Sequence, residues 1–357
     1  MPSIYGEKIH VSIFGQSHSA AIGVVIDGLP AGVKIDMAEL GRFMARRAPG
    51  QGKYATARKE ADLPEFVSGV VDDVTCGAPV CELIRNTDKN SGDYANMRDM
   101  PRPSHADYPA YVKFGAAHDI RGGGHFSGRL TAPLCIAGGI ALQMLRARGV
   151  SIGAHIASVG SVNDARFDAV NVSASDFDKI AANGFPVLDC HAGEKMLAEI
   201  ESARADADSI GGTIECAAVG LPAGLGDALF GGLEGRMSMA LFGVPAVKGV
   251  EFGNGFDCAT LRGSQNNDPF VIENGKIKTL TNNAGGILGG ITTGMPFIFK
   301  VAIKPTPSIG KPQQSVSLSR MENSELVIKG RHDPCIVPRA VPVIEAAAAL
   351  ALLDVML

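Results

Sequence analysis

The amino-acid sequence predicts an α+β fold in which two β-sheets enclose a layer of buried helices. Residues 22–32 (IGVVIDGLPAG) and 214–224 (IECAAVGLPAG) are near repeats, each an apolar run that ends in the turn Gly-Leu-Pro-Ala-Gly. Segments 131–148 and 341–357 are apolar around almost their whole circumference, which predicts helices buried on all sides. Together these observations predict a layered β-α-β sandwich with an internal pseudo-duplication.

Each repeat is followed by a predicted helix, at about 37–47 and about 228–242. The first begins at Asp36, where Glu39 three residues later completes a capping-box pattern. The helix at 131–148 ends at Gly149, a residue type that commonly follows the last helical turn. Apolar runs predict further strands at 8–14, 66–72, 79–85, 247–253 and 297–304.

A single domain spanning residues 1–357 accounts for this pattern, with a peripheral insertion at about 155–210. The insertion is more acidic than its surroundings and carries two predicted helices, 173–182 and 194–203. A chain of 357 residues that is 46% hydrophobic is long enough to bury a sizeable core.

The composition argues against several classes of function. A formal net charge of −4 and the absence of tryptophan disfavour nucleic-acid binding, which relies on basic surfaces and base stacking. We expect no metal site, because the sequence has neither an HExxH motif nor a Cys/His ligand set. Seven cysteines without a CxxC pair are typical of free thiols in a reducing compartment.

The ends of the chain predict neither a signal peptide nor a membrane span. The first residues, MPSIYGEK, lack an apolar stretch, and Glu345 and Asp354 interrupt the apolar run at 341–357. We therefore expect a cytoplasmic protein without membrane contact.

A triple glycine stands out in the stretch Asp-Ile-Arg-Gly-Gly-Gly-His125-Phe-Ser-Gly-Arg129. A glycine-rich turn that leads into a buried helix exposes backbone N–H groups at the positive end of the helix dipole, which favours anion binding. Arg121 and Ser127 add further donors. The alternative is a strained turn whose glycines only permit tight packing.

The segment 46–59 gathers five cations after the first predicted helix, namely Arg46, Arg47, Lys53, Arg58 and Lys59. The alternative for Arg46 and Arg47 is a structural role, because cations at the end of a helix complement the negative end of its dipole. The remaining three favour a loop that closes over a multiply charged anion.

Three loops carry histidines suited to proton transfer near neutral pH: Gly-Gln-Ser-His18, His105-Ala-Asp-Tyr and Arg331-His-Asp333-Pro. A purely structural role is the alternative for each. The glycine-rich segment 282–294, followed by the Lys/Thr/Ser cluster 304–308, suits a flat ring with a phosphate tail.

Taken together, these stretches resemble the chorismate synthase family over essentially the full length. The resemblance is carried by motifs in the family's order: GQSH18 with IDGLPAG, RRAPG with RKEAD, HADY with RGGG, AVKGVE with GNGF, GSQN with NAGGILGG, and RHDPC.

The resemblance implies a carbon–oxygen lyase of the shikimate pathway, in aromatic amino acid biosynthesis. The reaction implied is anti 1,4-elimination of phosphate from 5-enolpyruvylshikimate 3-phosphate to give chorismate. It implies reduced FMN as cofactor without net redox change, a homotetramer, and NADPH as an alternative source of reductant.

The resemblance also assigns roles to individual positions. His18 would protonate the departing phosphate with Ser17 in the same relay, His105 would address the reduced flavin, and Asp333 would take part in proton removal through the flavin. The substrate- or NADP-binding cations would be Arg47, Lys53, Arg58 and Arg129. The FMN-binding positions would be His125, Phe126, Ser127, Pro245, Ala246, Gly289, Lys304, Pro305, Thr306, Pro307, Ser308 and Arg331.

The chain departs from the usual family pattern at a few positions. Six positions differ from the best-known family pattern. This chain has Gln16 in place of Glu, Ser19 in place of Gly, Ala48 in place of Arg, Pro245 in place of Asn, His125 in place of an arginine that binds the flavin phosphate, and Leu130 in place of an acidic residue. These changes bear on FMN affinity more than on the reaction. Two other functions stay open at this point: a phosphate-binding lyase or transferase without flavin, and a non-catalytic protein that binds anions or nucleic acids.

Overall fold

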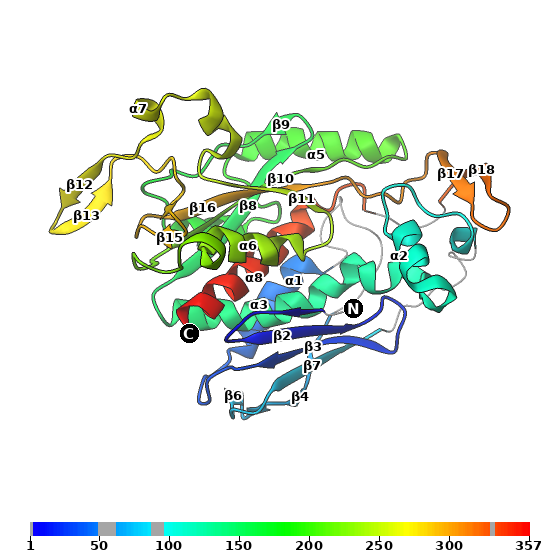
Figure 1. Cartoon of the computed structure of the whole chain (residues 1–357), viewed down its shortest axis with the longest axis horizontal. Helices are drawn as coiled ribbons and strands as arrows, with labels where there is room; N and C mark the ends of the chain where they lie inside the picture. Colours follow the sequence, from blue (N-terminus) through cyan, green and yellow to red (C-terminus); the bar gives the residue numbers. More distant parts are fainter. Residues whose placement is uncertain (1–2, 49–61, 87–95, 329–332) are drawn as a thin grey trace.

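Two five-stranded antiparallel sheets enclose a layer of helices in the computed structural model, which describes residues 3–48, 62–86, 96–328 and 333–357 (Figure 1). The first sheet has the order β1 (Ile4–Tyr5), β2 (His10–Gly15), β3 (Ala21–Asp27), β7 (Val80–Arg85) and β4 (Glu65–Ser68). The second has the order β11 (Val247–Phe252), β16 (Phe297–Ile303), β10 (Gly212–Val219), β8 (Ser151–Val159) and β9 (Val162–Asn163). The predicted α+β sandwich is confirmed.

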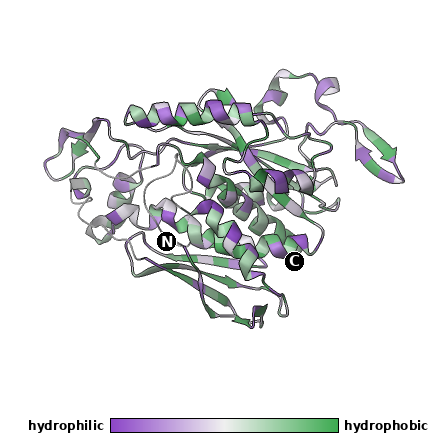
Figure 2. Ribbon diagram, turned by 180° about the vertical axis from the view of Figure 1, so that it is seen from behind, coloured by the Kyte–Doolittle hydropathy of each residue, from purple (hydrophilic) through white to green (hydrophobic). Residues whose placement is uncertain are grey.

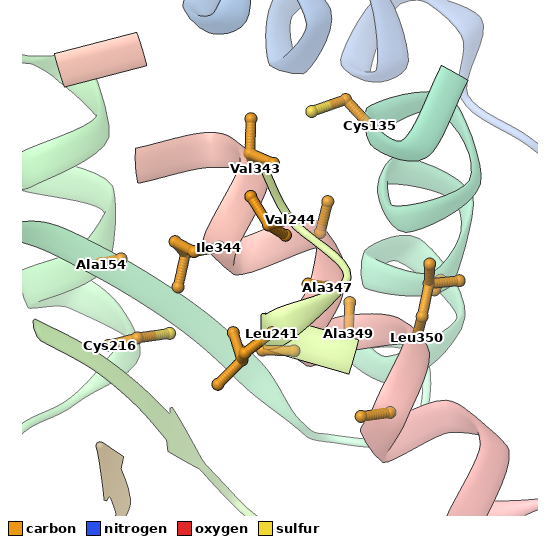
Figure 3. Close-up of a cluster of buried hydrophobic side chains, with 14 of the residues drawn as sticks. Cys135, Ala154, Cys216, Leu241, Val244, Val343, Ile344, Ala347, Ala349 and Leu350 are labelled. Carbon is orange, nitrogen blue, oxygen red and sulfur yellow. The ribbon is translucent and has the colours of Figure 1, made fainter. Parts of the chain in front are cut away.

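The helix layer consists of α1 (Met37–Arg47), α3 (Thr131–Arg146) and α8 (Val337–Met356). The backbones of α3 and α8 approach closely, since a Cβ atom on Gly138 would lie 2.2 Å from the Cβ of Ala346. Figure 3 shows Cys135 of α3, Val343 of α8 and Cys216 of β10 in one apolar cluster. Figure 2 shows the same layer as mostly hydrophobic.

One helical stretch, Gly128–Arg146, is long and apolar enough for a membrane span, but 83% of its most apolar window is buried inside the protein. It is a core helix here.

The two repeats occupy equivalent places, because β3 and β10 are the central strands of their sheets. Their turns are also closed in the same way. The Thr75 hydroxyl donates to the carbonyl of Pro30 at 2.7 Å, and the Thr292 hydroxyl donates to the carbonyl of Pro222 at 2.7 Å. Each threonine also accepts a hydrogen bond of 2.9 Å from the backbone two residues after the turn's alanine. The pseudo-duplication is therefore confirmed at the level of individual hydrogen bonds.

Most of the predicted helices are present with modest changes in length. Asp36 caps α1 by accepting from the N–H of Glu39 at 2.8 Å. The other half of the predicted capping box is not formed, because the N–H of Asp36 donates to Gln143 Oε1 at 2.8 Å. The helix expected at 228–242 is split by glycines into a short turn, Leu229–Gly231, and α6 (Leu233–Phe242). The predicted helices near 173–182 and 194–203 are α4 (Ala174–Ala182) and α5 (Cys190–Ala205).

The structure differs from the sequence prediction at the start of the segment 155–210. Residues 155–159 belong to β8, a strand that the sequence did not predict and that pairs with β10. His155 projects from it as a fully buried side chain, bonded to Asp164 and Glu215 at 3.0 and 2.9 Å. A buried histidine between two carboxylates hides the apolar alternation by which a strand is recognised.

Smaller elements complete the chain. They are β5 (Val70–Val71), β6 (Val74–Thr75), α2 (Asp107–Phe114), α7 (Gly263–Asn266), β12 (Phe270–Glu273), β13 (Lys276–Thr279), β14 (Ile287–Leu288), β15 (Ile291–Thr292), β17 (Gln313–Ser317) and β18 (Glu322–Leu326), with short 3-10 turns at 96–98, 115–117, 121–126, 128–130 and 255–260. The hairpin β12–β13 projects from the body of the protein (Figure 1).

Glu82 of β7 should make the protein less stable as pH rises. Its carboxylate is fully buried and has no hydrogen-bond partner among the described residues, and burial raises its pKa from 4.5 to about 8. The folded protein therefore keeps a proton that the unfolded chain releases above pH 4.5, so stability falls between these values, by on the order of a few kcal/mol. In Glu82→Gln, the free energy of unfolding measured with urea should therefore fall less steeply with pH across this range than in the wild type.

Glu65→Gln is the matched control, because Glu65 is exposed and paired with Arg85 at 3.0 Å. An unchanged slope in Glu82→Gln would show that the carboxyl group at position 82 ionises in the folded protein.

Candidate active site

A cavity of about 950 Å³ opens beside the N-terminal ends of α3 and α8. Fourteen of the residues singled out in the sequence line it: Ser17, Arg47, His105, His125, Phe126, Ser127, Arg129, Pro245, Ala246, Lys304, Thr306, Pro307, Ser308 and Asp333. Six arginines and lysines but only one carboxylate lie among its described lining residues. The lining is thus cationic in a protein of net charge −4, and two helix N-termini add to the positive potential.

Other singled-out residues lie elsewhere or outside the described part of the chain. Lys53, Arg58 and Arg331 fall outside the described residues. Gly289 lies in the turn between β14 and β15 and, like Pro305, is not among the described lining residues. His18 is buried directly behind the glycine loop. The roles of all six residues stay predictions.

The three glycines bring two histidine loops against one short backbone segment. Gly122, Gly123 and Gly124 all have positive φ angles, of 60°, 86° and 57°. A Cβ on Gly122 would lie 2.4 Å from Ser17 Oγ and 2.5 Å from His18 Nδ1. A Cβ on Gly123 would lie 3.1 Å from Nε2 of His105. The loop therefore needs glycine for both its conformation and its neighbours.

Three of the arginines that line the cavity are held by two carboxylates. Asp62, which is fully buried, accepts from Arg47 at 2.6 Å and also pairs with Arg129. Arg339 of α8 pairs with Asp333 and donates from Nε to the carbonyl of Arg47 at 3.1 Å. Burial lowers the pKa of Arg47 and the neighbouring charge of Arg339 lowers it further, against the opposing effect of Asp62. Three cations in this arrangement favour binding of an anion with several oxygens.

A second cationic group lies at the 304–308 segment. Burial lowers the pKa of Lys304, and the charge of Lys248 adds to the effect. The ammonium of Lys304 donates to the carbonyl of Ser104, and Arg102 donates to the Ser308 hydroxyl at 3.3 Å. The loop that carries His105 is therefore attached to the 304–308 segment at two points.

His125 is fully engaged by the protein itself. Its Nδ1 donates to the carbonyl of Gly15 at 2.7 Å, and its Nε2 lies 2.6 Å from the hydroxyl oxygen of Ser3. The ring therefore ties the N-terminal segment to the glycine loop. Ser19, another departure, is bonded locally to Gln16 and Ala21 within the turn between β2 and β3.

Comparison with known proteins shows which family the chain belongs to. The family model for chorismate synthase matches residues 9–357. A chorismate synthase from Lancefieldella parvula is 47% identical over 365 residues, covering 99% of this chain and 96% of the relative. One from Thermococcus gammatolerans is 47% identical over 349 residues, covering 98% and 96%. The chain belongs to the chorismate synthase family.

A solved structure agrees with this assignment. A crystal structure of chorismate synthase superposes with a TM-score of 0.78 at 26% identity, covering 98% of this chain and 92% of the other. As a member of the chorismate synthase family, the protein is a carbon–oxygen lyase that serves the chorismate-forming step of the shikimate pathway, and hence aromatic amino acid biosynthesis.

Sequence reasoning missed several residues of this candidate site: Asp62, Arg102, Asp107, Lys248 and Arg339. Asp62 and Asp107 lie within the motifs RKEAD and HADY, but nothing local shows that a carboxylate there pairs with an arginine. Arg339 had a usable signal, because a single arginine at the start of a long apolar helix needs a partner. Within the described residues, no group of three or more His, Cys, Asp or Glu side chains is arranged to bind a metal ion.

Replacing Gly122 with alanine should lower turnover in chorismate formation. The added methyl group collides with Ser17 and His18, and the positive φ disfavours any side chain. We expect a loss of at least roughly tenfold, since small displacements of positioned groups are costly to rate. The measurement is the steady-state rate, with thermal unfolding to check the fold.

Gly41→Ala is the matched control, because a Cβ at this exposed position in α1 meets nothing within 4 Å. It should keep the rate and raise stability slightly. Equal rates for Gly122→Ala and wild type would show that the loop does not position the two side chains.

Proposed function

We propose that this enzyme converts 5-enolpyruvylshikimate 3-phosphate to chorismate within the cavity, by anti 1,4-elimination of phosphate and a ring hydrogen, with reduced FMN as cofactor and no net redox change. The observation that carries the proposal is the meeting of three paired arginines, two histidine loops and two helix N-termini at one cavity. The substrate is a multiply charged anion, and a site for it must offset that charge while excluding water.

The arginine cluster would bind the anionic groups of the substrate. Arg47 and Arg129 share Asp62, so their guanidinium groups are held in place before an anion arrives. Preorganised donors of this kind stabilise charge that develops on a leaving group without reorganising during the reaction. Arg339 would extend the cluster toward Asp333.

The two histidines would handle protons on either side of the glycine loop. In this proposal His18, with Ser17 beside it, donates a proton to the departing phosphate. His105 faces the cofactor from the other side of the loop, and Asp333 takes part in removing the ring hydrogen. Histidine suits the roles proposed for His18 and His105, because the ordinary pKa of its side chain lies near neutrality.

The cavity and its lining fit reduced FMN. Its volume of about 950 Å³ lies in the range of cofactor sites, and apolar side chains of α3, α8 and the β11 region form one wall. The cofactor would be held by Lys304, Thr306 to Ser308, Phe126 to Ser127 and Pro245 to Ala246. His125 would contribute by fixing the loop, because both of its ring nitrogens already have partners in the protein. Reduced FMN supplies electron density that assists departure of the phosphate and is recovered as the hydrogen leaves.

The direct test is anaerobic phosphate release from 5-enolpyruvylshikimate 3-phosphate. We expect phosphate release with dithionite-reduced FMN. If phosphate is also released with oxidised FMN plus NADPH, the enzyme has an intrinsic flavin reductase activity as well. His18→Ala and His105→Ala should each lower turnover by roughly 10²–10⁴-fold with folding intact. His191→Ala, on an exposed histidine of α5, is the control and should keep the wild-type rate.

No release from the folded protein in either setting would reject the proposed reaction and favour a flavin-independent use of the scaffold. Near-normal turnover in both histidine variants would reject the proton-transfer roles. Unchanged turnover without any FMN would reject the cofactor requirement.

We also propose a cytoplasmic homotetramer in which the hairpin β12–β13 contacts a second copy of the chain. The hairpin is a two-stranded sheet by itself, and Phe270, Ile272 and Ile277 are exposed by 66%, 81% and 72%. An isolated two-stranded hairpin is marginally stable, and an exposed apolar surface of this kind marks an interface. In Figure 2 the ribbon of this projecting hairpin carries hydrophobic residues, in green, beside hydrophilic ones, in purple.

A double variant, Ile272→Lys with Ile277→Lys, should shift the assembly to smaller species in analytical ultracentrifugation. Val71→Lys, at an apolar residue exposed by 61% in the separate two-stranded hairpin β5–β6, is the control and should sediment as wild type. An unchanged sedimentation coefficient for the double variant would reject this hairpin as an interface.

A further inference from the structure

Asp107 is a buried carboxylate next to the candidate active site that the proposed reaction does not use. It is the first residue of α2, and its side chain is 1% exposed. Arg102 holds both of its oxygens: Nε lies 2.7 Å from Oδ2 and Nη2 lies 2.8 Å from Oδ1. The backbone N–H of Arg102 adds a third bond to Oδ2 at 3.1 Å. The carboxylate is therefore fixed in one orientation.

The remaining lone pair of Asp107 Oδ1 faces the imidazole of His105. The distance from His105 Nδ1 to Oδ1 is 2.6 Å. Because an ionised carboxylate only accepts hydrogen bonds, this contact requires a proton on Nδ1. The neutral ring then carries its lone pair on Nε2, which is the nitrogen that lies against Gly123 at the cavity.

The competing partner for His105 Nδ1 is Arg102, whose Nη2 lies 3.1 Å away. A guanidinium can only donate, so this contact would require an unprotonated Nδ1 and would put the proton on Nε2. Two observations favour the carboxylate. Its contact is shorter, and the same Nη2 is already closer to Asp107 Oδ1, at 2.8 Å.

The charge state of Asp107 supports this arrangement. Burial opposes its ionisation, but hydrogen bonds from Arg102 and His105 outweigh that effect and hold its pKa well below the ordinary range. The carboxylate is therefore ionised throughout the pH range in which histidine titrates. Arg102 balances the charge, and Lys304 is attached to the same loop through Ser104.

We propose that Asp107 is a positioning residue that keeps the proton of His105 on Nδ1 and leaves Nε2 as the proton-accepting atom at the cavity. The proposal rests on the proposed role of His105 at the cofactor. The bond from Arg102 to Ser308 extends the assembly to the 304–308 segment, so ring orientation and cofactor segment are set together.

Asp107→Asn tests the proton placement directly. An amide at this position must turn its NH₂ group toward either Arg102 or His105 Nδ1, so the carboxylate contact that selects the tautomer is lost. We expect ¹⁵N NMR of histidine-labelled protein without FMN to show Nδ1–H for His105 in the wild type, at a pH where the ring is neutral. In Asp107→Asn the proton should move to Nε2 or be shared between the two nitrogens.

Asp99→Asn is the matched control, because Asp99 accepts from Ser317 and Ser319 and has no bond to His105. It should leave the His105 signal unchanged. A wild-type tautomer in Asp107→Asn would reject the proposal whatever the enzyme's activity, so this outcome is distinguishable from failure of the proposed function.

The kinetic test separates positioning from a purely structural role. Asp107→Asn should lower kcat by roughly 10–100-fold, as loss of a group that orients a functional histidine does, with KM for the substrate nearly unchanged. In the His105→Ala background the same substitution should add little, because it acts through the missing ring. An equal fold-loss in both backgrounds would reject positioning through His105.

Discussion

Three consecutive residues without side chains set the geometry on which this site depends. Ser17 and His18 on one side and His105 on the other lie so close to the backbone of Gly122 and Gly123 that a methyl group would collide with the first pair and crowd the second. The glycines bear a large entropic cost on folding, which the packing of two loops and the start of a buried helix offsets. Because the same segment leads into α3, the loops are placed at the positive end of a helix as a consequence of that packing.

The site also depends on burying positive charge without leaving it unpaired. An isolated buried guanidinium is strongly unfavourable, yet Arg47, Arg129 and Arg339 all lie at or below the cavity surface. Asp62 and Asp333 offset that penalty, and because one carboxylate serves two arginines in the first case, the cluster keeps an excess of positive charge. The same principle holds Asp107 between Arg102 and His105. Carboxylates here keep the cationic side chains in place while the cavity remains suited to an anion.

The internal duplication explains where the cavity lies. Each half supplies a five-stranded sheet with a repeat strand at its centre, and each supplies one long buried helix. The close approach of Gly138 to Ala346 packs α3 and α8 side by side, and lining residues come from the first turn of α3 and from α8 between Arg339 and Leu350. The halves differ in what they contribute to the cavity. One contributes the glycine loop and both histidine loops, and the other contributes the 304–308 segment and Arg339.

The sequence by itself determined the sandwich class, the repeated turn, the buried helices and the motif residues that line the cavity, because these depend on local periodicity and residue type. It could not place Asp62 against two arginines or Asp107 against His105, since nothing local shows what a carboxylate will meet after folding. Nor could it show that both ring nitrogens of His125, an FMN-binding position implied by the resemblance, contact Gly15 and Ser3. The strand β8 was missed because His155, a polar residue on that strand, is buried only through partners distant in sequence. Tertiary structure decided these features because charge pairing and desolvation depend on distances between segments, which the order of residues does not contain.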